Sequence, residues 1–127
     1  MKILFYIGTG GCLGAISRYL LSGYVQQWSR SSSFPYGTLA VNLLGCGCIG
    51  FLSYLAEQRG ILSSEMRGFL IVGILGGFTT FSTFANESMN MARVGEFTFS
   101  LLNIGAHVLF GLFAVWCGRN LAYLMWR

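Results

Sequence analysis

Residues 73–87 begin as an apolar, membrane-like span and then lose the sequence character of a helix. Gly76 and Gly77 stand side by side, and each glycine costs about 1 kcal/mol relative to alanine in a helix interior. Thr79 and Thr80 follow; they are β-branched, and their hydroxyls compete for backbone hydrogen bonds. Broken backbone is tolerated at membrane depth only against protein or along a water-filled path. The stretch therefore predicts a permeation or binding site.

The composition supports a membrane chain around this stretch. Apolar residues make up 54% of the 127 residues and charged residues 9%, which excludes most soluble classes. Because a spanning helix needs about 20 mainly apolar residues, four spans would occupy most of the chain. The sequence predicts a single domain, residues 1–127, of the all-α membrane class, with four transmembrane helices and a break in the third. The expected helices cover about residues 3–25, 35–56, 67–92 and 97–122.

The first span has to be separated from a secretory signal, because Lys2 precedes a short apolar run. The apolar pattern continues through residues 13–21, past any cleavage point, so a retained helix is expected. Arg18 lies inside this span and is expected to face the protein interior or to reach an interface. Gly10 and Gly14 form a small-xxx-small pair suited to close helix contact.

Polar residues recur on one face of the second and fourth expected helices. Thr38 and Asn42 are four residues apart and share a face. A deeply placed asparagine has to find partners, so Asn42 is expected either to make an interhelical hydrogen bond or to line a pore. Asn103 and His107 have the same spacing in the fourth helix. A lone histidine there is more typical of hydrogen-bonded packing than of a catalyst or ligand.

Basic residues near the helix ends give a modest orientation bias. The expected membrane face that holds both termini has five of them: Lys2, Arg59, Arg67, Arg119 and Arg127. The other face has Arg30 and Arg93, and Arg18 is expected to lie nearer to this face. This count does not settle a single orientation. Because the basic residues are scattered rather than run together, nucleic acid is not an expected partner.

The chain has only four acidic residues. There is no aspartate, and Glu87 is the only acid expected within a span, near the far end of the third helix. Neither a Ser/His/Asp arrangement nor a carboxylate pair can form, so no enzyme activity is expected. A conduit, a coupled transporter and a small structural membrane subunit remain.

The residue types favour an anion conduit over a cation conduit. Asn42 offers N–H donors, and Ser82 and Thr83 offer O–H donors. Phe81 and Phe84 are three residues apart, so they project from one side if the helix resumes there. The positive edge of an aromatic ring can steady a small anion without a fixed cation. The competing interpretation is that both rings face lipid or pack in the ordinary way.

Three segments carry a resemblance to a known family. Residues 76–84, Gly-Gly-Phe-Thr-Thr-Phe-Ser-Thr-Phe, followed by Glu87, closely resemble the signature of the Fluc fluoride channels, the CrcB family. Residues 35–42 and 14–18 resemble the family's second-helix and first-helix motifs, so the likeness covers nearly the whole chain. Val72 and Ala85 depart from it, since many members have threonine and serine there.

The resemblance implies an antiparallel, dual-topology homodimer in the cell (inner) membrane, with two fluoride pathways along the interface between its two copies. By motif position it implies that the pathway residues are Asn42, Phe81, Phe84, Ser82, Thr83, Thr38 and His107. It also implies a structural Na⁺ at the dimer centre, held by the backbone carbonyls of Gly76 and Thr79 from both copies. Arg18 and Glu87 are expected to have structural or electrostatic roles.

The function that the resemblance implies is passive, selective fluoride efflux, which protects the cell from fluoride toxicity. Two other functions stay open. A small proton-coupled multidrug exporter needs an acid in the middle of a span, commonly the first, and residues 3–25 contain none. A structural membrane subunit would pass no ion.

Overall fold

The computed structural model describes residues 1–58 and 60–126. Arg59 and Arg127, counted above for orientation, lie outside the described residues. Three continuous helices are α1 (Lys2–Ser29), α2 (Tyr36–Gln58) and α6 (Phe97–Met125). The third span runs over Ser64–Arg93 in four pieces: α3 (Ser64–Arg67), the π-helix η1 (Gly68–Leu75), α4 (Gly76–Phe78) and α5 (Phe81–Arg93).

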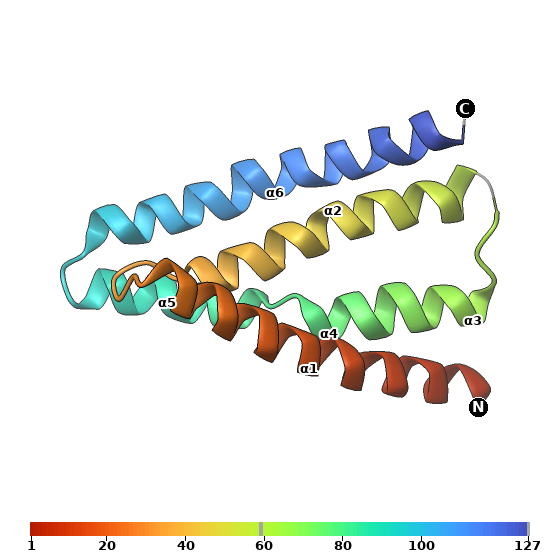
Figure 1. Ribbon diagram of the computed structural model, residues 1–127, viewed down its shortest axis with the longest axis horizontal. Coiled ribbons are helices and arrows are strands. Elements are labelled where there is room, and N and C mark those ends of the chain that lie inside the picture. Colours follow the sequence, from red (N-terminus) through yellow and green to blue (C-terminus); the bar gives the residue numbers. More distant parts are fainter. Residues whose placement is uncertain (59, 127) are drawn as a thin grey trace.

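The spans form an antiparallel bundle in which both chain ends lie at the same end (Figure 1). Within the described residues, four helices are long and apolar enough to cross a membrane, counting the third span as one. The predicted all-helical architecture with an irregular third span is confirmed at this level. All four observed spans extend one to four residues beyond the C-terminal limits expected from sequence; helix ends are the least certain part of such an assignment.

Glycines let α1 approach the third span closely. A Cβ atom at Gly10 would meet the carbonyl oxygen of Phe69, and one at Gly14 would meet the Ile74 carbonyl oxygen and the Phe78 backbone nitrogen. The close contact predicted from the Gly10–Gly14 spacing is therefore confirmed. Without side chains in between, two backbones gain van der Waals contact, which drives helix association where lipid removes the hydrophobic advantage.

Glycines also bring α2 and α6 into close backbone contact. A Cβ atom at Gly50 would meet the backbone of Val115, and one at Gly118 would meet the backbone of Gly47. At one end of this pair, Arg119 makes an exposed ion pair with Glu57 at 3.0 Å. Exposed ion pairs contribute little to stability, so backbone packing holds these two helices together.

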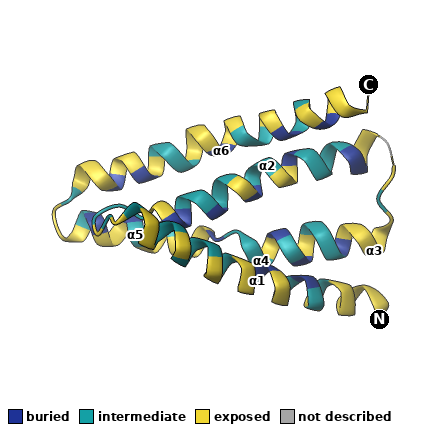
Figure 2. Ribbon diagram, viewed as in Figure 1, coloured by how far each residue is buried: buried dark blue, intermediate teal, exposed yellow. Residues whose placement is uncertain are grey.

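Buried residues form a thin line between the helices, and most outward-facing positions are exposed (Figure 2). Val41 on α2 is fully buried, whereas long apolar side chains such as Leu109 and Phe113 on α6 are exposed. Such side chains can remain exposed in a membrane because lipid tails are as apolar as they are. The buried interior is therefore narrow, and it contains polar as well as apolar side chains.

Candidate functional site

The helix of the third span is interrupted at Thr79 and Thr80, whose backbones are extended (φ −88°, ψ 159° and φ −151°, ψ 111°). In a continuous helix the Thr80 N–H would pair with the Gly76 carbonyl, but here it donates to Asn42 Oδ1 at 2.8 Å. The glycines of the pair remain helical in α4. The break thus follows the glycine pair, because a side-chain acceptor competes successfully for the Thr80 N–H.

Asn42 on α2 binds both backbone groups of Thr80. Its Oδ1 accepts from the Thr80 N–H, and its Nδ2 donates to the Thr80 carbonyl at 3.0 Å. Asn42 therefore makes an interhelical hydrogen bond, one of the two placements expected from sequence. Since an amide nitrogen carries two hydrogens, one N–H of Asn42 remains beyond this pairing.

The helix resumes with a capped start. The Thr80 hydroxyl accepts from the Thr83 N–H at 3.2 Å, as an N-cap residue does. The same hydroxyl donates to Thr83 Oγ1 at 2.9 Å, so the hydrogen of the Thr83 hydroxyl is left for another acceptor. Ser82 and Thr83 are both exposed on the single chain. Thr80 was expected to weaken the helix but was not predicted as a site residue; the signal for its capping role is a threonine directly before a resumed helix.

Two phenylalanines lie at this helix start. The rings of Phe81 and Phe84 meet edge to face, with centroids 5.4 Å apart and an interplanar angle of 61°. They project from one side of α5, as their spacing predicted. Phe84 also lies against His107 of α6 in a tilted arrangement, with ring centroids 4.2 Å apart and an interplanar angle of 34°. These three rings and Asn42 line one cavity of about 410 Å³ beside the break.

His107 is fixed by its own helix. Its Nδ1 lies 2.9 Å from the Asn103 carbonyl oxygen. A carbonyl can only accept, so Nδ1 carries the hydrogen. The other ring nitrogen, Nε2, is buried without a hydrogen-bond partner among the described residues. A neutral His107 therefore presents an acceptor, not an N–H donor, at Nε2.

Arg18 on α1 turns inward to the break. Its Nη1 donates to the Thr79 carbonyl oxygen at 3.3 Å. This is the first of the two placements expected for an arginine within a span. A fixed positive charge thus lies beside a backbone that has lost its helical pairing, where it favours an approaching anion.

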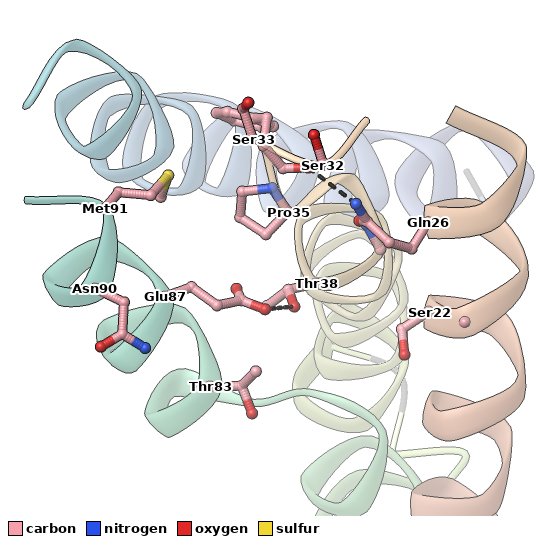
Figure 3. A pocket seen from close by; sticks show the side chains of 13 residues that line it. Ser22, Gln26, Ser32, Ser33, Pro35, Thr38, Thr83, Glu87, Asn90 and Met91 are labelled. Carbon is pink, nitrogen blue, oxygen red and sulfur yellow. Dashed lines mark hydrogen bonds between the residues drawn. The ribbon is translucent and has the colours of Figure 1, made fainter. Parts of the chain in front are cut away.

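A second cavity, of about 450 Å³, lies between α1, α2 and α5, next to the loop that follows α1 (Figure 3). Thr38 donates its hydroxyl hydrogen to Glu87 Oε1 at 2.7 Å across this cavity. Glu87 Oε2 is buried with no partner among the described residues. The described lining is otherwise uncharged, including Ser22 and Asn90. This cavity is a polar vestibule with a single acid.

Gln26 holds the wall of this vestibule. Its Nε2 donates to the carbonyls of Ser31 and Phe34 at 2.7 and 3.1 Å, and its Oε1 accepts from the Gly37 N–H at 3.0 Å. One side chain of α1 therefore fixes both the loop and the start of α2. The sequence offered no local signal for this, because the contact joins residues brought together by the loop.

The predicted site residues fall into two neighbouring groups. Around the break lie Asn42, Phe81, Phe84, Ser82, Thr83, His107, Gly76, Thr79 and Arg18. Thr38 and Glu87 lie in the vestibule, to which Thr83 also contributes. Three polar residues that were not predicted as site residues link α5 to α6 behind Phe84: Ser88, Ser100 and Asn103.

Comparison with known proteins decides the family. Residues 5–119 match the family model described as CrcB-like protein, Camphor Resistance (CrcB). The chain belongs to the CrcB family. The resemblance drawn from its motifs is thereby confirmed, and the three motif segments that carried it are part of a likeness that extends over most of the chain.

Curated CrcB relatives are similar over nearly their full lengths. The fluoride-specific ion channel FluC of Hydrogenovibrio crunogenus is 50% identical over 115 residues, 91% of this chain and 86% of the relative. FluC of Elusimicrobium minutum is 43% identical over 127 residues, 98% and 97% of the two chains. FluC 1 of Methanosarcina acetivorans is 44% identical over 119 residues, 94% and 89%.

Proposed function

We propose that this CrcB-family protein is a fluoride-selective ion channel of the cell membrane, not an enzyme, and that it lets fluoride leave the cell passively. Its curated relatives bear the name of fluoride-specific ion channels. The observation that carries the proposal is the break at Thr79 and Thr80, which places paired aromatic rings and hydroxyls beside backbone released from helical pairing.

The pathway follows α5 past the break. Fluoride is small and strongly hydrated, so donors have to replace its water step by step. Ser82 and Thr83 supply O–H donors, and Asn42 supplies the N–H that Thr80 does not use. The positive edges of Phe81 and Phe84 steady the ion between these donors. A narrow route of this kind rejects the larger chloride by size.

The break and the vestibule differ in charge. Arg18 brings a positive charge to the break and raises the local fluoride concentration. At the vestibule, Thr38 and Glu87 set the polar surroundings through their mutual hydrogen bond. His107 contributes its ring, which lies against Phe84, to the pathway wall.

The channel works as an antiparallel homodimer with two pathways, as the family resemblance implies. Phe81 is 78% exposed on the single chain, and Gly76, Ser82 and Thr83 are exposed as well. Irregular backbone and hydroxyls at membrane depth are tolerated only against protein or water. A second copy laid against this face would cover them and complete a path that a single chain leaves open to lipid.

A sodium ion at the centre of the dimer fits the residues present. The Gly76 carbonyl has lost the Thr80 N–H as its helical partner, and the Thr79 carbonyl has a second lone pair beyond the one used by Arg18. Hard cations prefer such oxygen ligands. Bound there by both copies, sodium would join them. Exchange into sodium-free choline buffer should lower the dimer fraction in native mass spectrometry; an unchanged fraction would remove sodium from the assembly.

The two alternatives have less support. A proton-coupled exporter needs a carboxylate in mid-span, and α1 carries no acid. Glu87 lies in the vestibule near the loop that follows α1. A structural subunit needs no cavity beside a helix break, whereas this protein has one, lined by Asn42, Phe81 and Phe84 among others.

The test is reconstitution. Purified protein in liposomes should release fluoride down its gradient and retain chloride, measured with ion-selective electrodes. The release should not require a proton gradient. Liposomes that retain fluoride as well as chloride would show a structural subunit, and release of both halides at similar rates would contradict the proposed selectivity.

A further inference from the structure

A buried chain of hydrogen bonds joins α5 to α6 directly behind Phe84. Asn103 of α6 is fully buried, and its Nδ2 donates to Ser88 Oγ at 2.9 Å. Ser88 Oγ donates to the Phe84 carbonyl oxygen at 2.9 Å. Ser100 of α6 donates to the Ser88 carbonyl oxygen at 2.8 Å. The first turns of α5 are thus tied to α6 by polar side chains.

The donor count fixes the direction of this chain. A serine hydroxyl has one hydrogen, and that of Ser88 goes to the Phe84 carbonyl, so Ser88 Oγ has to accept from Asn103. The orientation of the Asn103 amide follows from this. The backbone carbonyl of Asn103 also anchors His107, whose ring lies against that of Phe84. Asn103 is therefore connected to Phe84 by two routes. Ser88 connects Asn103 to the backbone carbonyl of Phe84, and His107 connects Asn103 to the ring of Phe84.

Stability alone does not account for an amide at this place. Asn103 Oδ1 is buried without a hydrogen-bond partner among the described residues. An unpaired buried acceptor is destabilising, and replacing both members of a buried polar pair by apolar groups of similar shape is often neutral. A leucine at position 103 with an alanine at position 88 would thus maintain the fold without the link to Phe84.

We infer that Asn103 and Ser88 are positioning residues of the ion pathway. They fix the start of α5 so that the ring of Phe84 rests on His107 and its edge stays available to the ion. This inference rests on the proposed fluoride channel function. A site that recognises a small ion through ring edges depends on their placement, and a shift well below 1 Å is enough to impair such a site.

The experiment compares Asn103→Leu, Ser88→Ala and the double variant in liposomes. Each single change should slow fluoride efflux about tenfold. The double variant should be no slower than the slower single one, because both changes remove the same link. Its melting temperature in detergent should stay near that of the unmodified protein. Ser88→Thr keeps the hydroxyl and should retain the flux. Asn120→Leu, which removes an exposed amide of α6 bonded to Trp116, is the matched control.

A spectroscopic readout keeps the inference separate from channel activity. 4-Fluorophenylalanine placed at position 84 alone should give one narrow ¹⁹F resonance in the unmodified protein and in Ser88→Thr, and a shifted or broadened one in Asn103→Leu. If the unmodified protein passes no fluoride, the proposed function fails and this signal still tests the positioning role. An unchanged resonance in Asn103→Leu, an unchanged flux, or additive losses in the double variant would each overturn the inference.

Discussion

The two halves of the third span are held in different ways. Before the break, η1 is entirely apolar and meets α1 through glycines, with Gly73 and Gly10 close enough for backbone contact. After the break, α5 is polar along one face and is tied to its neighbours by hydrogen bonds, from Thr38 to Glu87 and from Asn103 to Ser88. One span thus combines packing that depends on shape with packing that depends on donors and acceptors.

The difference explains where the site lies. A contact between two helix backbones is disrupted by added side-chain volume. A hydrogen-bonded contact is disrupted instead when a substitution removes the donor or the acceptor. The break at Thr79 and Thr80 is the junction between the two regimes. Backbone groups released there are satisfied by side chains on one side, by Asn42 and Arg18, and lie open on the other.

The largest effect is expected in the glycine-packed half. In Gly14→Ala, the added methyl group would overlap the backbones of Ile74 and Phe78, neither of which is a flexible side-chain end. Overpacking of this kind should cost about 3 kcal/mol or more, seen as loss of folded, monodisperse protein. Gly8→Ala is the control, because a Cβ atom there meets nothing within 4 Å. Equal yields from the two variants would contradict the packing described for this half.

The next effect is expected at the junction. Asn42→Ala leaves both backbone groups of Thr80 without their partner, which should cost about 2 kcal/mol and slow fluoride efflux strongly. A melting temperature of Asn42→Ala equal to that of Asn120→Ala would show that the pairing adds no stability.

The smallest effect is expected at the acid of the hydrogen-bonded half. Glu87→Gln keeps the shape of the side chain and an oxygen that the Thr38 hydroxyl can still reach. Fluoride efflux should fall by less than about tenfold, a change under about 1.4 kcal/mol. A proton-coupled exporter would lose all transport instead. Complete loss of flux in this variant, with the protein still folded, would favour the exporter.

The sequence predicted much of this molecule because its signals are local. Apolar length predicted the four spans, the Gly10–Gly14 spacing predicted close contact, and the spacing of Phe81 and Phe84 predicted rings on one side. The exact place of the break was not predictable, because it depends on Asn42, which comes from a distant part of the chain.

The hydrogen-bond chain from Asn103 through Ser88 to Phe84 was not predicted from the sequence, for the same reason. Asn103 and His107 were expected to share one face of the fourth helix, but their partners Ser88 and Phe84 belong to α5. Spacing along a helix shows which residues share a face and not what that face meets. The hydrogen bonds from Gln26 to the loop that follows α1 were also not predictable, because their acceptors are backbone carbonyls that any residue type would supply.

The central claim is that the paired rings beside the break form the path. Fluoride efflux from liposomes should be abolished or sharply slowed by Phe81→Ile and by Phe84→Ile, while both variants keep the oligomeric state of the unmodified protein. Phe5→Ile, which changes an exposed ring near the start of α1, should leave efflux unchanged. Efflux from both site variants at the rate of Phe5→Ile would remove the phenylalanines from the mechanism and contradict the account.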